Sequence, residues 1–174
     1  MLASEIKKIV REVPGFPKPG ITFYDVTTLF RSAVAFRSIV ERIVERYRGE
    51  RIDAIAAIEA RGFVLGAAVA AGLEVGLILV RKAGKLPHVT ESETYDLEYG
   101  QASIEVHRDA VGEGQRILVI DDVLATGGTA AAVGRIVTRL GGQVLGYAFL
   151  LEIDSLAGRS KLGGTPVFSL LHYA

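Results

Sequence analysis

The segment Ile117–Ala130 reads ILVIDDVLATGGTA, and its change from apolar residues to acidic residues and then to glycines and threonines decides the fold. The apolar run Ile117–Ile120 is typical of a parallel strand that is covered on both faces of a sheet. Two adjacent carboxylates, Asp121 and Asp122, follow the run, and a short loop and a helical pattern come next. In an open α/β sheet, ligands bind beyond the carboxyl ends of the strands. The segment therefore predicts a parallel sheet and a binding site at its edge.

The loop after this strand has the composition of a phosphate-binding loop. Its two glycines allow the backbone to approach an anion and to turn N–H groups toward it. Its two threonines add hydroxyl donors, and the following helix adds a partial positive charge at its first turn. The predicted phosphate-binding residues are Ala125, Thr126, Gly127, Gly128 and Thr129. The loop is neither a Walker loop nor the G-x-G-x-x-G turn of dinucleotide-binding folds.

The acidic pair in front of this loop is badly placed to contact a phosphate. Asp121 and Asp122 instead suit hydroxyl donors on an attached sugar, or a bound metal. An ordinary strand-to-helix turn, with Asp and Thr acting as helix caps, is the alternative interpretation. Two acids directly after an apolar strand, combined with a double glycine, favour the binding site.

A second strand end also carries charged residues. Glu59 and Arg61 follow the apolar run Ala54–Ile58, and a helical pattern starts at Gly62. An arginine at a helix N-terminus opposes the helix dipole, so we expect an anionic group to compensate Arg61. A surface ion pair between Glu59 and Arg61 is the alternative.

Further cations follow the next apolar run, Leu77–Val80. Arg81 and Lys82 come directly after it, and Lys85 lies a few residues beyond. Because the carboxyl ends of parallel strands meet at one edge of a sheet, Arg61, Lys82 and Lys85 are candidates to converge on one highly charged anion. Solvated surface positions for the two lysines are the alternative.

Apolar runs alternate with helical patterns along most of the chain. This order predicts an α/β fold, in which helices cover both faces of a mostly parallel sheet through right-handed crossovers. The predicted strands are 54–58, 77–80, 102–106, 117–120 and 144–151, and the predicted helices are 2–13, 33–47, 62–71 and 129–140. Ser32 is the candidate N-cap of the helix over 33–47. Residues 83–100 have few apolar anchors and are predicted to form a long mobile loop, which in a compact domain is usually functional.

Composition limits the class of protein. A chain of 174 residues is expected to form one domain. Its 20 Lys and Arg balance 20 Asp and Glu, which argues against a nucleic-acid partner. The absence of Cys excludes disulfides, thiolate metal sites and a Cys nucleophile. The three histidines, His88, His107 and His172, lack the spacing of a metal site.

One segment is long enough to suggest a membrane span. Phe63–Val80 contains a single charge, Glu74. Its three glycines, and its change from an Ala-rich half to a short apolar run, favour a buried helix followed by a buried strand. Glu5 and Lys7 at helical spacing do not fit a signal peptide, so we expect no membrane partner and a cytoplasmic location.

Five motifs, in order, resemble those of the adenine phosphoribosyltransferases, which belong to the type I phosphoribosyltransferases. The motifs are Phe16–Asp25, Glu59–Phe63, Val80–Lys82 with Gly84–Pro87, Tyr95–Gly100 and Ala125–Thr129. They span most of the chain, and only the part after Asp154 is weakly distinctive. The resemblance implies a mainly parallel, five-stranded central sheet flanked by helices. It also implies a single domain over 1–174, with a small hood mainly in 1–30, a flexible catalytic loop at about 83–100 and the substrate motif at 117–130.

The resemblance implies transfer of the phosphoribosyl group of phosphoribosyl pyrophosphate (PRPP) to adenine, giving AMP and pyrophosphate with Mg²⁺. The metal would be held through the pyrophosphate and the ribose hydroxyls, with no certain direct protein ligand. A homodimer is also implied, to which Phe63, Val64 and Leu65 would contribute an apolar patch.

The resemblance also implies roles for individual residues. Asp121 and Asp122 would bind the ribose hydroxyls, and 125–129 would hold the 5′-phosphate. The residues near the pyrophosphate would be Glu59, Ala60, Arg61, Lys82 and Lys85, and the catalytic residues would be Glu98, Arg61 and Lys82. Glu98 would accept a proton from the purine or support the charge on the sugar, and a solvated carboxylate is its alternative. In this family the peptide between Glu59 and Ala60 often has an unusual geometry.

Adenine would stack on Phe23, and its edge would meet backbone groups near Thr22 and Tyr24. Relatives that use 6-oxopurines commonly place an Asp where this chain has Ala125, which argues against hypoxanthine and guanine. Two alternatives remain open. One is a regulatory protein that binds PRPP without turnover, and the other is an enzyme for another purine such as xanthine.

Overall fold

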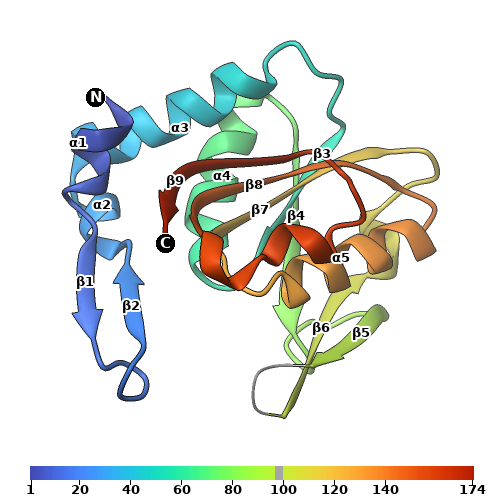
Figure 1. Cartoon of the computed structure of the whole chain (residues 1–174). Helices are drawn as coiled ribbons and strands as arrows, with labels where there is room; N and C mark the ends of the chain where they lie inside the picture. Colours follow the sequence, from blue (N-terminus) through green and yellow to red (C-terminus); the bar gives the residue numbers. More distant parts are fainter. Residues whose placement is uncertain (97–99) are drawn as a thin grey trace.

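The computed structural model describes residues 1–96 and 100–174 and is built around one seven-stranded sheet (Figure 1). The strand order is β5-β6-β4-β3-β7-β8-β9. Strands β4, β3, β7, β8 and β9 run parallel, and β6 and β5 add an antiparallel hairpin at one edge. The strands are β3 (Ala54–Ile58), β4 (Gly76–Lys82), β5 (Thr90–Asp96), β6 (Gln101–His107), β7 (Arg116–Leu124), β8 (Gln143–Ile153) and β9 (Val167–Tyr173). The predicted five-stranded parallel sheet is confirmed, with the hairpin as an extension.

Helices cover both faces of this sheet, as predicted (Figure 1). The long helices are α3 (Ala33–Tyr47), α4 (Arg61–Leu73) and α5 (Gly128–Arg139). Ile55 and Leu118 pack with α3 and α4 on one face, and Ala56 and Val119 pack with α5 on the other. Alternate residues of β3 and β7 therefore belong to different cores, which explains why both strands are continuously apolar. Ser32 caps α3, since its side chain accepts a hydrogen bond from the N–H of Ala35.

The N-terminal segment differs from the prediction of a helix over 2–13. Helix α1 (Ala3–Lys7) ends early, and β1 (Arg11–Pro14) pairs antiparallel with β2 (Thr22–Asp25) in a separate two-stranded sheet. A short helix α2 (Thr27–Arg31) then leads to α3. The apolar stripe alone did not show that Arg11–Pro14 pairs with Thr22–Asp25, and this pairing replaces the second half of the predicted helix. Figure 1 shows this hairpin standing beside the main sheet.

The prediction of an irregular loop over 83–100 is wrong for its middle part, because β5 lies there. Glu91 and Glu93 of β5 form ion pairs with Arg139 of α5, at 2.9 and 2.6 Å, and Glu93 also pairs with Arg135 at 2.6 Å. Arg135 and Arg139 lower the pKa of Glu93 through these hydrogen bonds. The charges that suggested a loop are therefore the groups that attach the strand to a helix.

Two further parts of the chain complete the fold. The segment Phe63–Val80 forms most of α4 and β4, as predicted, and among the described residues no helix is both long and apolar enough to cross a membrane. Strand β9, which was not predicted, pairs parallel with β8. Short 3₁₀ turns occupy η1 (Arg108–Ala110), η2 (Asp154–Leu156) and η3 (Gly158–Lys161).

Gly66 tests the close packing of α4 on β3. A Cβ atom at Gly66 would lie 2.5 Å from Cβ of Ala57, so Gly66→Ala forces the helix away from the strand. Overpacking typically costs about 1–3 kcal/mol, and the better helix propensity of Ala recovers at most about 1 kcal/mol. We expect urea denaturation to give a lower free energy of unfolding for Gly66→Ala. The control Gly49→Ala meets nothing within 4 Å and should not lower stability. Equal stability of the two variants would contradict the packing argument.

Candidate active site

A cavity of about 590 Å³ lies where the carboxyl ends of β3, β4 and β7 meet the N-terminal hairpin. It collects residues that are far apart in the sequence. Of the residues predicted from the sequence, it is lined by Thr22, Phe23, Tyr24, Glu59, Ala60, Arg61, Lys82, Asp121, Asp122 and Ala125. The parallel topology thus brings the two charged strand ends together, as expected from the rule for open sheets.

A second, smaller cavity of about 70 Å³ lies next to the first, over the predicted phosphate loop. Residues 123–130 line it, and Asp121, Val123 and Ala125 line both cavities. Gly127 has a φ of +77° and precedes the first turn of α5, a conformation that favours glycine. The hydroxyl of Thr129 donates to the hydroxyl of Tyr95 at 3.0 Å, which links the loop to β5. A helix N-terminus with glycines and hydroxyls around a small cavity suits a phosphate group.

The acidic pair lies near the carboxyl end of β7, inside the strand, because β7 continues to Leu124 beyond the predicted end at Ile120. Asp122 is 4% exposed and accepts a hydrogen bond from Nε of Arg61. The N–H of Asp122 donates to Oδ1 of Asp121 at 2.8 Å. Burial, and next the charge of Asp122, raise the pKa of Asp121 well above its ordinary value. Hydroxyl donors or a cation would relieve this repulsion, so the pair fits a sugar or a metal-bound sugar.

Arg61 is the first residue of α4 and is compensated by Asp122, not by Glu59. The alternative of a Glu59–Arg61 pair is therefore wrong. Gly62 allows this contact, because a Cβ atom there would lie 2.9 Å from Oδ1 of Asp121 and 3.1 Å from the carbonyl oxygen of Ile120. The guanidinium carbon of Arg61 also lies 5.6 Å from the centre of the Phe23 ring. Arg61 thus connects the acidic pair to the aromatic side of the cavity.

Glu59 binds cations at the end of β4 and just after it. Its carboxylate accepts from Nζ of Lys85 at 2.7 Å, from Nε of Arg81 at 3.3 Å and from the N–H of Lys82 at 3.1 Å. The hydrogen bond from Lys85 is the main cause that lowers the pKa of Glu59 to about 2. Lys82 and Arg61 line the cavity, and Lys85 is held beside it by Glu59. The peptide bond between Glu59 and Ala60 is cis.

The aromatic side of the cavity comes from the N-terminal hairpin. The ring of Phe23 packs edge-on against Phe16, with ring centres 5.3 Å apart. Ile153 and Leu156 also line this cavity, and the sequence analysis missed both. They lie at the junction of β8 and η2, and their apolar side chains gave no signal that distinguishes lining residues from core residues. Glu98, the predicted proton acceptor, lies outside the described residues.

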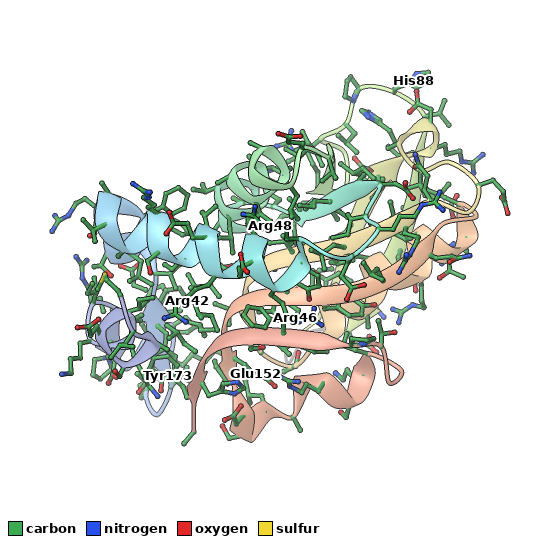
Figure 2. All side chains as sticks on the ribbon, turned by 90° about the horizontal axis from the view of Figure 1, so that it is seen from above. Arg42, Arg46, Arg48, His88, Glu152 and Tyr173 are labelled. Atoms are coloured by element: carbon green, nitrogen blue, oxygen red, sulfur yellow. The ribbon has the colours of Figure 1, made fainter. Side chains whose placement is uncertain are left out.

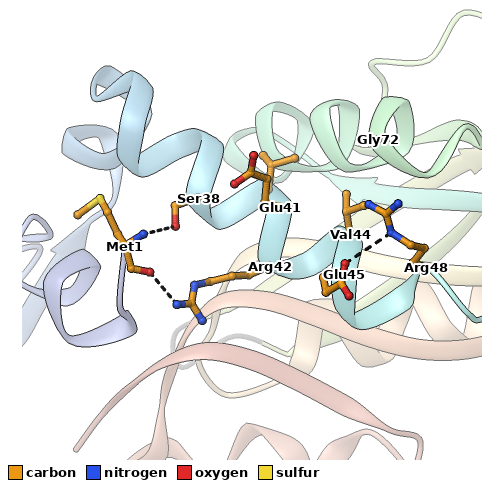
Figure 3. Close-up of a pocket in the computed structure, with 9 residues that line it drawn as sticks. Met1, Ser38, Glu41, Arg42, Val44, Glu45, Arg48 and Gly72 are labelled. Atoms are coloured by element: carbon orange, nitrogen blue, oxygen red, sulfur yellow. Dashed lines mark hydrogen bonds and ion pairs between the residues drawn. The ribbon is translucent and has the colours of Figure 1, made fainter.

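A larger hollow of about 640 Å³ lies between α3, α4 and the N-terminus (Figure 3). The guanidinium of Arg42 donates to the carbonyl oxygen of Met1 at 2.7 Å, and Arg48 pairs with Glu45 at 3.5 Å. Within the part of the chain that the structure describes, none of the residues predicted to bind substrate lines it. The smaller cavity at the strand ends is therefore the candidate site, because it contains the convergent charges.

One further cluster could offer metal ligands among the described residues. Single oxygen or nitrogen atoms of Glu152, Asp154 and His172 lie within 4.8 Å of one another. Arg159, however, binds both oxygens of Glu152, and His172 lies 2.8 Å from Asp154. The cluster is thus an ion-pair network. His88 lies far from Glu152 in Figure 2, so the three histidines do not form one site.

Known proteins resemble the chain over almost its entire length. The family model of the phosphoribosyl transferase domain matches residues 26–168. A protein of Geobacter metallireducens named adenine phosphoribosyltransferase is 52% identical over 169 residues, covering 97% of this chain and 99% of the relative.

Solved structures agree with these sequence matches. The adenine phosphoribosyltransferase of Thermoanaerobacter pseudethanolicus superposes with a TM-score of 0.95 at 48% identity, covering 98% of this chain and 99% of that one. The enzyme of Saccharomyces cerevisiae was solved with adenine and an imino-altritol bisphosphate. It superposes with a TM-score of 0.92 at 40% identity, covering 97% of this chain and 98% of that one. The site and these matches together show that the chain belongs to the adenine phosphoribosyltransferase family.

Proposed function

We propose that the chain transfers the phosphoribosyl group of PRPP to adenine and releases AMP and pyrophosphate. The observation that carries the proposal is one cavity that contains an acidic pair, an arginine and an aromatic side chain beside a phosphate-sized loop site. These groups match the parts of PRPP and a purine. The related Giardia lamblia structure was solved with 9-deazaadenine, and that of Trypanosoma brucei with AMP, pyrophosphate and ribose 5-phosphate.

In the proposed complex, Asp121 and Asp122 accept hydrogen bonds from the ribose hydroxyls, and residues 125–129 bind the 5′-phosphate. Arg61 and Lys82 contact the pyrophosphate. Lys85 reaches it by leaving Glu59, which stays paired with Arg81. Asp122 keeps Arg61 in place, since both groups already share a hydrogen bond. These roles use the charges of the apo site without requiring new ones.

The reaction separates charge, and the site is built to stabilise that separation. The bond between C1 of the ribose and the pyrophosphate oxygen breaks, which leaves positive charge on the sugar and negative charge on pyrophosphate. Arg61, which Asp122 holds in place before the substrate binds, and Lys82 stabilise the leaving group. N9 of adenine then bonds to C1, and we propose that its proton passes to Glu98. A wild-type kcat in Glu98→Ala would contradict this role.

We also propose that Mg²⁺ binds with the substrate. Burial and the charge of Asp122 raise the pKa of Asp121. The two carboxylates form a donor set that fits ribose hydroxyls bound to a divalent cation. When bound, Mg²⁺ supplies additional positive charge for the pyrophosphate.

A homodimer is a further proposal. Val64 of α4, with Leu77 and Leu79 of β4, is 39–45% exposed, which suits an apolar interface. The earlier expectation for Leu65 is wrong, because its side chain is fully buried in the core. A monomer in sedimentation at assay concentration would contradict the proposal. We also propose that the hairpin of β1 and β2 serves as the hood over the cavity.

Asp121→Asn should separate activity from stability. Removing a charged hydrogen-bond acceptor should lower kcat/KM for PRPP by roughly 10- to 100-fold. The raised pKa means that the folded state holds its proton more tightly than the unfolded state does. Wild-type stability should therefore fall as pH rises from about 4 through the folded pKa of Asp121, and Asp121→Asn should lose this decline.

Denaturation at several pH values, with kinetics at pH 7, checks both expectations. The exposed Asp109 provides the control, since Asp109→Asn should keep wild-type activity. Unchanged PRPP kinetics in a folded Asp121→Asn protein would contradict the assignment of the acidic pair.

The choice of base tests the proposed function against its alternatives. Adenine carries a 6-amino donor and an unprotonated N1 acceptor, and hypoxanthine reverses both. Fixed backbone groups near Thr22 and Tyr24 cannot reverse in response, and Ala125 offers no side chain that could accept the wrong base. Such a site can reject an analogue by about 10⁴-fold.

Offering PRPP with adenine, hypoxanthine, guanine and xanthine should yield AMP and almost no other nucleotide. Comparable kcat/KM for adenine and hypoxanthine would contradict the backbone-pocket argument. Binding of PRPP without any product would favour a regulatory protein, and a preference for xanthine would favour the other alternative.

A further inference from the structure

The backbone of the phosphate loop is in direct contact with Gly158, the first residue of the 3₁₀ turn η3. A Cβ atom at Gly158 would lie 2.2 Å from the carbonyl oxygen of Ala125 and 3.1 Å from the nitrogen of Gly127. Conversely, a Cβ atom at Gly127 would lie 2.3 Å from the carbonyl oxygen of Gly158. The two backbones are therefore in direct contact, and any displacement of Gly158 displaces the loop. Figure 1 shows this turn beside the start of α5.

The residue after Gly158 is anchored by a strong ion pair. Nε and Nη2 of Arg159 donate to the carboxylate of Glu152 at 2.7 Å each, and Nη1 donates to the carbonyl oxygen of Val167 at 3.1 Å. The Glu152 side chain is only 4% exposed, so its carboxylate is held in one place by the surrounding residues and fixes the guanidinium of Arg159 there. A bidentate (two-pronged) contact between an arginine and a carboxylate fixes the orientation of the guanidinium as well as its distance.

Glu152 is itself held at a defined place relative to the loop. It lies on β8 directly opposite Leu124, the last residue of β7 before the loop. Burial favours the neutral form of Glu152, but the hydrogen bonds from Arg159 outweigh it and the pKa of Glu152 is lowered. The pair therefore stays ionised at neutral pH, and the sheet serves as the rigid reference for the turn.

We propose that Arg159, Glu152 and Gly158 are positioning residues that hold the loop 125–129 in the conformation that binds the 5′-phosphate of PRPP. The proposal rests on the proposed function, because it assumes that the loop binds this phosphate. It assigns a role to the part of the chain that carried the weakest signal in the sequence. None of the three residues lines either cavity, so each acts through the loop.

Two variants test the proposal by different routes. Arg159→Lys keeps the positive charge and loses the two-pronged contact. Gly158→Ala leaves the ion pair and pushes directly on Ala125 and Gly127. Both should raise the KM for PRPP about tenfold, as expected for weakened hydrogen bonds to a charged group, while kcat at saturating substrates changes much less. The control Ser155→Ala alters an exposed residue of the adjacent turn η2 and should behave as the wild type.

Calorimetry with ribose 5-phosphate and with AMP separates positioning from general damage. Both probes carry the 5′-phosphate, so both affinities should fall by about the same factor. Weakening of AMP alone would overturn the proposal, because it would place the effect on the base side near Leu156. A lower melting temperature with wild-type affinity for both probes would also overturn it. The three residues would then stabilise the fold without positioning the loop.

The same measurement keeps the two proposals apart. If the wild type binds ribose 5-phosphate but forms no AMP from adenine and PRPP, the proposed function fails while the positioning role is still tested by the two variants. If the wild type does not bind ribose 5-phosphate, the positioning role is overturned.

Discussion

The structure depends on two adjacent carboxylates held at the end of one buried strand. Asp121 and Asp122 lie together near the carboxyl end of β7, and burial, followed by the charge of Asp122, raises the pKa of Asp121. A single cation from the neighbouring strand end, Arg61, compensates Asp122. That contact requires the start of α4 to approach β7 closely, and Gly62 allows it. The site is thus set up for a ligand that brings hydroxyl groups and further positive charge.

Further cations at the site are also paired with carboxylates, which come from adjacent parallel strands. Glu59 follows β3 and forms ion pairs with Arg81 and Lys85 from the β4 side, while Arg61 pairs with Asp122 of β7. Arg61, Arg81 and Lys85 each form an ion pair with a carboxylate of the site, so these three like charges are opposed. When an anionic substrate binds, a cation only has to exchange its carboxylate partner for the substrate. This is a smaller rearrangement than assembling the site from separate groups.

Much of this could be predicted from the sequence, because strand ends in a parallel sheet meet at one edge. The apolar runs Ala54–Ile58 and Ile117–Ile120, with the charges after each, were sufficient to predict that Arg61 and the acidic pair lie at the same edge of the sheet. The errors have physical causes. The stripe over 2–13 alone did not show the strand pairing of its second half, and Glu91 and Glu93 became strand residues only through α5. Contacts between distant segments, such as Arg159 with Glu152 and Gly158 with the loop, leave no local pattern in the sequence.

The most direct test of the account is a crystal structure of the protein with AMP bound. The account predicts that the 2′ and 3′ hydroxyls of the ribose lie within hydrogen-bond distance of the carboxylates of Asp121 and Asp122. It also predicts that the phosphate contacts the backbone of residues 125–129 and that the adenine ring stacks on Phe23. An AMP molecule whose ribose faces away from the two carboxylates would contradict the central claim.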